Sequence, residues 1–181
     1  MHGIGERGTT QEEFKKIITH GPPKLIEMGD WSPQYPFLVL SPQLYCVNKR
    51  RIYLTGLSLG GQGVWNYGGT YGLTGKVAAL VPVCSSGNLA NIQNLRHLPV
   101  WAFHGSNDNL IKAFSENGSV PMIMGINDSK PSVPAKVTIY PGVGHDSWTI
   151  TYNGEGQKNA ITANDPYDVD LYDWMLQYTK D

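Results

Sequence analysis

Arg51-Ile-Tyr-Leu-Thr55, followed directly by Gly56-Leu-Ser-Leu-Gly60, joins a short run of β-forming residues to a glycine-rich helix start. The run 51–55 predicts a buried strand, and the segment 60–72 has the length of a helix. A G-x-S-x-G sequence at such a junction allows a sharp turn, because glycine leaves room for a strained backbone. The pattern therefore predicts that the hydroxyl of Ser58 stands above the end of the strand.

Similar apolar runs and helical segments alternate along the rest of the chain. They predict a mostly parallel sheet with helices on both faces, an α/β fold, in one domain over residues 1–181. A final helix is expected after Asp165-Pro166, which supplies a cap and a first-turn proline. The other expected strands are 37–40, 77–83, 100–103 and 136–140. The other expected helices are 88–96, 109–126 and one that starts with Thr10 as its cap and stops at Gly21.

The composition excludes several function classes. Among 181 residues, 14 Lys and Arg balance 15 Asp and Glu, for a net charge of −1. This balance argues against a nucleic-acid binder and against a polybasic membrane patch. No apolar run approaches the roughly 20 residues that span a bilayer. The two cysteines form no recognisable pattern, and the sequence fits a cytoplasmic or a secreted protein equally well.

One junction does not fit a regular α/β pattern. Only ten residues, 41–50, separate the expected strand 37–40 from the next strand. A parallel crossover needs a dozen or more residues, usually with a helix. The two strands are therefore joined by a bare loop, or they are not neighbours in the sheet.

Polar side chains follow three of the expected strands. Ser58 follows the run 51–55, Asp108 follows 100–103, and His145 follows 136–140. Ligands of open parallel sheets bind outside the carboxyl ends of the strands, so these side chains are expected to meet at one edge.

A serine, a histidine and an acid at one edge predict nucleophilic catalysis. Ser58 would attack, His145 would take its proton, and Asp108 would orient the imidazole ring. Asp146 is less suitable as the acid because it directly follows His145, and side chains of sequence neighbours seldom face each other. His104 ends a strand in a His-Gly turn, and we expect a structural role for it.

The N–H groups that would stabilise an oxyanion are expected at two turns. The N–H of Leu59 lies at the predicted helix start, and that of Ile4 follows Gly3 in a turn-forming His-Gly-Ile-Gly sequence. Gly3 and Trp148 are the expected substrate contacts. Trp148 is preferred over the other aromatic candidates, Trp31, Trp65 and Tyr152, because it follows His145 by three residues.

These motifs together resemble the α/β-hydrolase superfamily, and finer features resemble its predicted phospholipase/carboxylesterase (peptidase-like esterase) branch. That branch borders polyhydroxybutyrate-depolymerase-like and feruloyl-esterase-like enzymes. The resemblance covers nearly the whole chain and implies a serine esterase without a cofactor, with Ser58, Asp108 and His145 as its triad. The finer motifs are His2-Gly-Ile-Gly-Glu-Arg-Gly8, Val39-Leu-Ser-Pro-Gln43, Pro99-Val-Trp-Ala-Phe-His-Gly105 and Tyr140-Pro-Gly-Val-Gly-His-Asp-Ser-Trp148.

The sequence departs from this family in two places. The family has strands before the His-Gly loop and a helix before the nucleophile strand, and residues 44–50 replace that helix here. The expectation is therefore a reduced α/β-hydrolase fold. Exposed strand edges invite pairing, so a homo-oligomer that completes the sheet is also expected.

Two other functions compete with a carboxylesterase acting on a small-molecule ester. A serine peptidase or acyltransferase would use the same triad and the same acyl-enzyme. A non-catalytic remnant of a hydrolase, which binds a ligand or partner, would explain the missing elements but not the three retained side chains. A metal hydrolase is not expected, because the five histidines are scattered along the chain.

Overall fold

The computed structural model describes residue 28 and residues 48–158, 161–162 and 169–181. Residues Lys49–Asp181 form one compact unit, and Met1–Asn48 form a second unit. Nearly all described residues belong to the unit Lys49–Asp181. The expected strand 37–40 and the junction 41–50 lie largely outside the described residues, and one domain over the whole chain stays a prediction.

In the described part of this unit, one five-stranded sheet forms the centre, in the order β1-β2-β3-β4-β5. The first four strands are parallel, and the short β5 pairs antiparallel with β4. The fold is therefore the α/β fold with a mostly parallel sheet that the sequence predicts. The strands are β1 (Tyr53–Leu57), β2 (Ala79–Val83), β3 (Trp101–Gly105), β4 (Lys136–Tyr140) and β5 (Ile161–Thr162).

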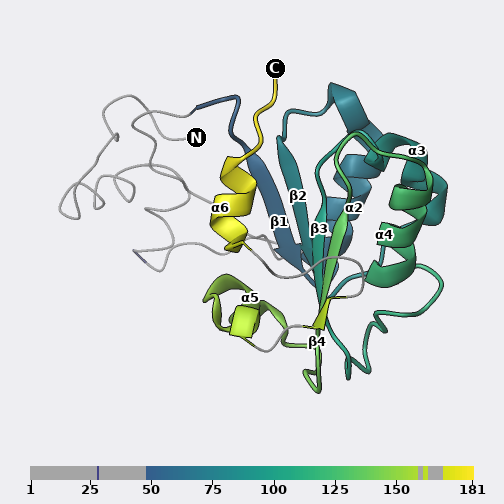
Figure 1. The fold of residues 1–181 in the computed structure, drawn as a ribbon, viewed down its shortest axis with the longest axis vertical. Helices are drawn as coiled ribbons and strands as arrows, with labels where there is room; N and C mark the ends of the chain where they lie inside the picture. Colours follow the sequence, from purple (N-terminus) through teal and green to yellow (C-terminus); the bar gives the residue numbers. More distant parts are fainter. Residues whose placement is uncertain (1–27, 29–47, 159–160, 163–168) are drawn as a thin grey trace. The chain divides into compact units, whose positions relative to one another are not determined.

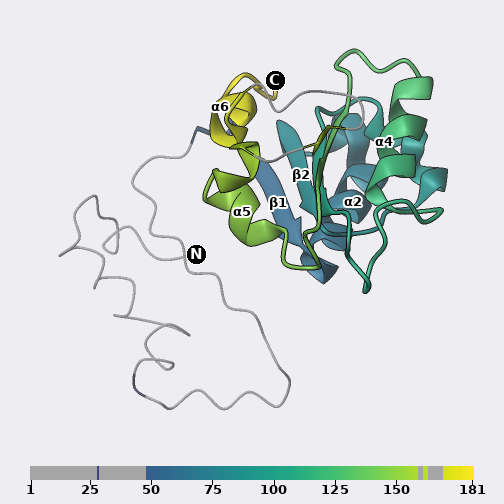
Figure 2. The ribbon, with the colours of Figure 1, turned by 60° about the horizontal axis from the view of Figure 1, so that its bottom comes forward.

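Helices cover both faces of the sheet (Figure 1). The helices α2, α3 and α4 lie on one side of it, and α5 and α6 lie on the other, as the turned view also shows (Figure 2). The helices are α2 (Leu59–Tyr71), α3 (Ile92–Leu95), α4 (Ser119–Asp128), α5 (Trp148–Tyr152) and α6 (Leu171–Leu176), with short 3-10 turns at Gly72–Thr74, Leu89–Asn91 and Glu155–Lys158.

The alternation of side chains along the strands divides the core into two clusters. Leu80, Ala102 and Val137 point toward the α2–α4 side and pack with residues such as Trp65 and Ile123. Val81, Phe103 and Tyr140 point to the other side and pack with Leu171 and Trp174 of α6. Both faces of the central strands are thus buried, which explains why these strands are mostly apolar.

Pro82 interrupts the ladder between β2 and β3. Leu80 and Cys84 donate their backbone N–H groups to Pro99 and Phe103 on the β3 side, at 2.9 and 2.8 Å. Pro82, midway between them, has no N–H to donate. The paired register of β2 with β3 is therefore confined to Val83 and Phe103, with an isolated bridge between Leu80 and Val100.

Several element boundaries differ from the sequence expectation. The first expected strand, 51–55, is shifted to Tyr53–Leu57, so it includes Gly56 of the turn motif. The expected helix 109–126 is reduced to α4, because residues 106–118 form a loop around Asp108. The last helix begins at Leu171 with Asp170 as its cap, whereas the predicted cap, Asp165, lies outside the described residues.

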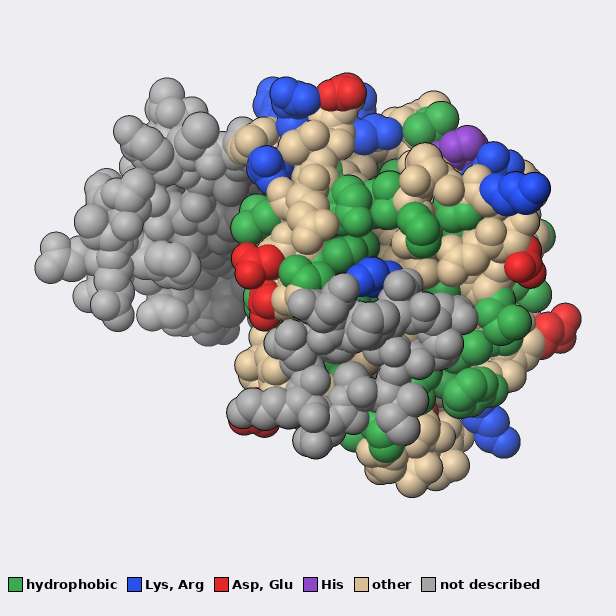
Figure 3. Space-filling model, viewed as in Figure 1, with side chains coloured by type: hydrophobic (Ala, Val, Ile, Leu, Met, Phe, Trp, Pro, Cys, Tyr) green, Lys and Arg blue, Asp and Glu red, His purple; other side chains and the backbone are tan. Residues whose placement is uncertain are grey.

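Charges of both signs appear around the face shown in the space-filling view (Figure 3), as the balanced composition predicts. Within the described part of the chain, no helix has the length and apolar character needed to cross a bilayer.

Candidate active site

Ser58 occupies the turn between β1 and α2 with a strained backbone. Its φ of 51° and ψ of −120° lie in a region that residues with a Cβ rarely adopt. Its backbone N–H points at β2, where it lies 3.0 Å from the carbonyl oxygen of Val83 and 3.3 Å from the sulfur of Cys84. These contacts hold the serine in the conformation that presents its hydroxyl above the end of the sheet.

The glycines around Ser58 have different roles. A Cβ on Gly56 would lie 2.6 Å from the backbone of Gly60, and a Cβ on Gly61 would lie 2.4 Å from the hydroxyl of Ser85. A Cβ on Gly60 would meet nothing within 4 Å. The close approach of strand and helix therefore requires Gly56 and Gly61, and the second glycine of the G-x-S-x-G sequence is not required sterically.

The structure brings Ser58, His145 and Asp108 together at the carboxyl ends of β1, β4 and β3. The Nε2 atom of His145 lies 2.9 Å from the Oγ atom of Ser58. The Nδ1 atom of His145 lies 2.7 Å from Oδ2 of Asp108. The two ring nitrogens thus contact the hydroxyl and the carboxylate at the same time. In this arrangement Nδ1–H donates to Asp108, which leaves Nε2 free to accept the serine proton.

The carboxylate of Asp108 is buried and held from two directions. Its Oδ1 atom accepts hydrogen bonds from the backbone N–H groups of Leu110 and Ile111, both at 2.9 Å. Burial by itself raises the pKa of this carboxyl. The hydrogen bonds from His145 and from these two N–H groups outweigh burial, so the pKa of Asp108 lies below its usual value. Asp108 is therefore a carboxylate at neutral pH, as an orienting acid must be.

A second histidine, His104, also contacts Asp108, and the sequence pattern did not predict this contact. The Nε2 atom of His104 lies 3.2 Å from Oδ2, the same oxygen that contacts His145. Its position four residues before Asp108 on a strand-to-loop junction was the available signal.

The N–H group of Leu59 lies at the first position of α2, directly after Ser58. The first N–H groups of a helix have no acceptor within the helix, and they lie at the positive end of its dipole. This position fits the expected oxyanion role, which stays a prediction. Ile4 and Gly3 lie outside the described residues, and so does Trp31.

Trp148 lies beside the histidine. The rings of His145 and Trp148 meet edge-on, with centroids 5.6 Å apart and an interplanar angle of 87°. Trp65, by contrast, is buried in the core on the α2–α4 side and cannot line a site at the strand ends. A substrate contact by Trp148 stays a prediction.

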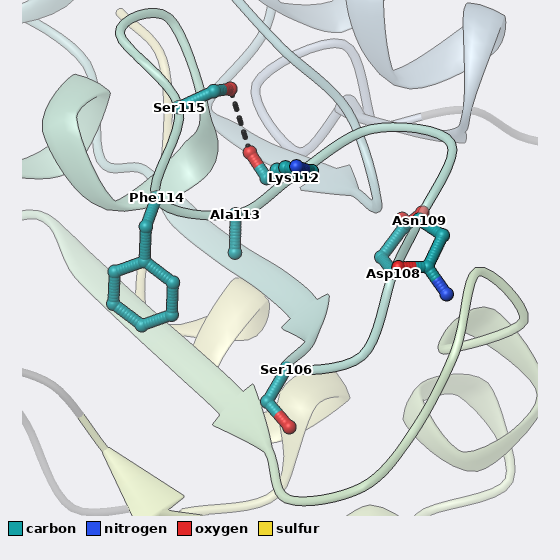
Figure 4. Close-up of a pocket in the computed structure, with 7 residues that line it drawn as sticks. All are labelled: Ser106, Asp108, Asn109, Lys112, Ala113, Phe114 and Ser115. Carbon is teal, nitrogen blue, oxygen red and sulfur yellow. Dashed lines mark hydrogen bonds between the residues drawn. The ribbon is translucent and has the colours of Figure 1, made fainter.

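A surface pocket of about 290 Å³ lies on the loop that follows β3 (Figure 4). Asp108 contributes to its wall, but Ser58 and His145 are not among the described residues that line it. It is therefore not the space in which a substrate would meet the serine. The lining residues are Ser106, Asp108, Asn109, Lys112, Ala113, Phe114 and Ser115. Among the described residues, no group of three or more His, Cys, Asp or Glu side chains could hold a metal ion.

Comparisons with known proteins identify the fold. No protein-family model matches the chain, and no curated protein matches it. Among solved structures, a thermostable esterase matches with a TM-score of 0.57 and 23% sequence identity over 74% of this chain. The described part of the chain has an α/β-hydrolase fold. The match covers 32% of the thermostable esterase, so the chain spans about a third of that protein's length.

The esterase PE8 has a lower similarity, with a TM-score of 0.47 and 18% identity over 61% of this chain and 49% of its own. In the α/β-hydrolase fold of this chain, the strand ends that carry Ser58, Asp108 and His145 are the ends of three parallel strands of one sheet.

Proposed function

We propose that this protein is a serine hydrolase that cleaves carboxylic esters through an acyl-enzyme. The observation that carries the proposal is the continuous chain of hydrogen-bond contacts from Ser58 through His145 to Asp108, at 2.9 and 2.7 Å. The α/β-hydrolase fold and its similarity to a thermostable esterase support this reading at the level of the fold.

In the proposed reaction, the hydroxyl oxygen of Ser58 attacks the ester carbonyl while its proton moves to Nε2 of His145. The tetrahedral intermediate places a negative charge on the former carbonyl oxygen, and the N–H groups of Leu59 and Ile4 are proposed to bind it. The intermediate expels the alcohol, which takes the proton from His145. Water then repeats the sequence on the acyl-enzyme and releases the acid.

Asp108 makes each proton transfer easier. Its carboxylate accepts the Nδ1–H of His145, which fixes the ring orientation and stabilises the imidazolium that forms in each step. Its low pKa keeps this charge in place at neutral pH. We propose small or exposed esters as substrates, with Trp148 and Gly3 as contacts, since the sequence has no long apolar segment typical of a lipase lid.

We test the proposal by replacing Ser58 with alanine and measuring hydrolysis of p-nitrophenyl acetate. The Ser58→Ala protein should lose essentially all turnover, because the proposed nucleophile is removed. Ser132→Ala, the same change at an exposed serine of another loop, should keep wild-type turnover. Undiminished hydrolysis by Ser58→Ala would remove the mechanism.

A homo-oligomer is the second part of the proposal. Among the described residues β1 pairs only with β2, and its side chains are half-buried or exposed, whereas those of β2 and β3 are all buried. An exposed strand edge can pair with another chain, and we propose a second copy of this chain as the partner.

A further inference from the structure

We propose that His104 is a positioning residue that fixes Asp108 for its contact with His145. The inference rests on the function proposed above and extends it by one residue. His104 lies near the end of β3, is fully buried, and points toward α4. Fully buried histidines need partners on both ring nitrogens, and those partners show what this ring does.

The contacts of His104 fix where its proton lies. Its Nε2 atom is 2.7 Å from the carbonyl oxygen of Ile111 and 3.2 Å from Oδ2 of Asp108. Both partners are acceptors, so Nε2 carries the proton and donates it. Burial lowers the pKa of His104, which favours the neutral ring, despite the contacts with Ile111 and Asp108. In that state Nδ1 faces the hydroxyl of Ser119, 2.8 Å away, whose one proton is shared between Nδ1 and the carbonyl oxygen of Ser85.

His104 completes the set of donors around Asp108. Oδ1 faces two backbone N–H groups of the loop, and Oδ2 faces one N–H of His145 and one of His104. Each oxygen therefore faces two donors, and the N–H of His104 is shared between Oδ2 and the nearer carbonyl oxygen of Ile111. Without His104, Oδ2 would depend on His145 alone, and the carboxylate would hold its orientation less firmly.

The same contacts connect the loop of Asp108 to the end of β2. The hydroxyl of Ser119, the first residue of α4, also lies 3.0 Å from the carbonyl oxygen of Ser85. Ser85 directly follows Cys84, whose sulfur contacts the N–H of Ser58. His104 therefore joins the acid loop to α4 and to the end of β2, which also supports the nucleophile.

The charges around this pair determine the direction of a pH effect. Asp108 and His145 are the titratable partners after β3 and β4. Cys84 directly follows β2, and burial raises its pKa to about 11, so its thiol is uncharged at neutral pH. Asp146, which follows β4, accepts hydrogen bonds from the backbone N–H and the hydroxyl of Thr149. Loss of the His104 donor makes Asp108 a stronger acceptor toward His145 and favours the imidazolium form of that ring. The acid limb of kcat/KM should then move to higher pH.

The experiment compares His104→Leu, His104→Gln and His97→Leu with the wild type. Leucine removes both ring nitrogens, glutamine can restore an N–H near Nε2, and His97 is an exposed histidine that serves as the matched control. For His104→Leu we expect kcat/KM with p-nitrophenyl acetate to fall roughly tenfold at neutral pH. The acid limb of its pH profile should shift to higher pH by about half a pH unit or more. His104→Gln should recover most of both, and His97→Leu should change neither.

A merely structural role gives a different result. Activity would then fall equally at all pH values, with the acid limb unmoved and no advantage of glutamine over leucine, and this outcome overturns the proposal. If His104→Leu does not fold, Ser119→Ala replaces it, since it frees the ring at Nδ1 without touching Asp108. A folded Ser119→Ala protein with an unmoved acid limb also overturns the proposal, and a smaller shift in the same direction supports it.

A spectroscopic measurement separates this proposal from the proposed function. The proton that His145 donates to Asp108 should give a low-field proton resonance, assigned by its loss in His145→Ala. Removal of the His104 donor should move this resonance to lower field, and His104→Gln should return it. This result does not depend on turnover, so a protein without esterase activity would still support or contradict the role of His104.

Discussion

At the scale of single residues, two strained backbones, those of Ser58 and Cys84, lie next to each other. Ser58 and Cys84 both have positive φ, at 51° and 40°, and the N–H of Ser58 contacts the sulfur of Cys84. Conformations of this kind cost about 1–3 kcal/mol each and persist only where the surroundings hold them. Here the surroundings are the ends of β1 and β2, and Ser58 itself is half-buried.

His104 makes the stability of the folded protein depend on pH. Burial lowers its pKa in the folded state, while the unfolded state keeps the ordinary value of about 6.5. Below that value the unfolded chain binds the proton more readily than the folded one, so the free energy of unfolding falls as the pH decreases. Denaturant titrations at about pH 7.5 and about pH 5.5 should show a larger loss for the wild type than for His104→Gln. Equal losses would contradict a buried neutral His104.

At the scale of elements, the junction of β1 and α2 depends on its glycines unequally. Gly56→Ala would press a methyl group into the backbone of Gly60 at 2.6 Å, so backbone atoms must move. We expect it to destabilise the protein by about 2 kcal/mol or more and to abolish hydrolysis. Gly60→Ala is the matched control, because its methyl group meets nothing within 4 Å and alanine favours the helix by up to about 1 kcal/mol.

Thermal unfolding of the two variants measures this difference. The melting temperature of Gly56→Ala should fall clearly, and that of Gly60→Ala should stay the same or rise. A similar loss of stability in both variants would mean that the strand and helix do not approach each other as described.

The sequence predicted the alternation of strands and helices because apolar β-forming runs mark buried parallel strands well. It predicted element ends less well. The loop 106–118 was expected to be largely helical, but hydrogen bonds from the backbone of Leu110 and Ile111 to Asp108 hold it in a different conformation. Such a tertiary contact is not visible in local propensity.

At the scale of the whole molecule, the two faces of the sheet hold different sets of contacts. The face toward α2–α4 holds His104 and its partner Ser119, which support Asp108. The other face packs α6 through Trp174, whose ring meets Trp101 edge-on with centroids 5.3 Å apart. The sequence could place Ser58, Asp108 and His145 at one sheet edge from chain order alone. It could not reveal His104, because the contact of that ring with Asp108 depends on how the loop folds back.

The proposed homo-oligomer can be tested on the 181-residue chain itself. If a second copy pairs at the edge of β1, light scattering of the full-length protein should give about twice the monomer mass. A mass of one chain, constant over a range of protein concentrations, would contradict the proposed homo-oligomer.

The central claim is that Ser58 is an activated nucleophile, and covalent labelling tests it most directly. A fluorophosphonate probe should form one adduct, which mass spectrometry of the digested protein should place on Ser58. Ser58→Ala should not be labelled there, and His145→Ala should be labelled far more slowly, because the histidine accepts the proton. A wild-type protein that stays unlabelled at Ser58, while a known serine hydrolase is labelled in the same tube, would contradict the account and favour a non-catalytic protein.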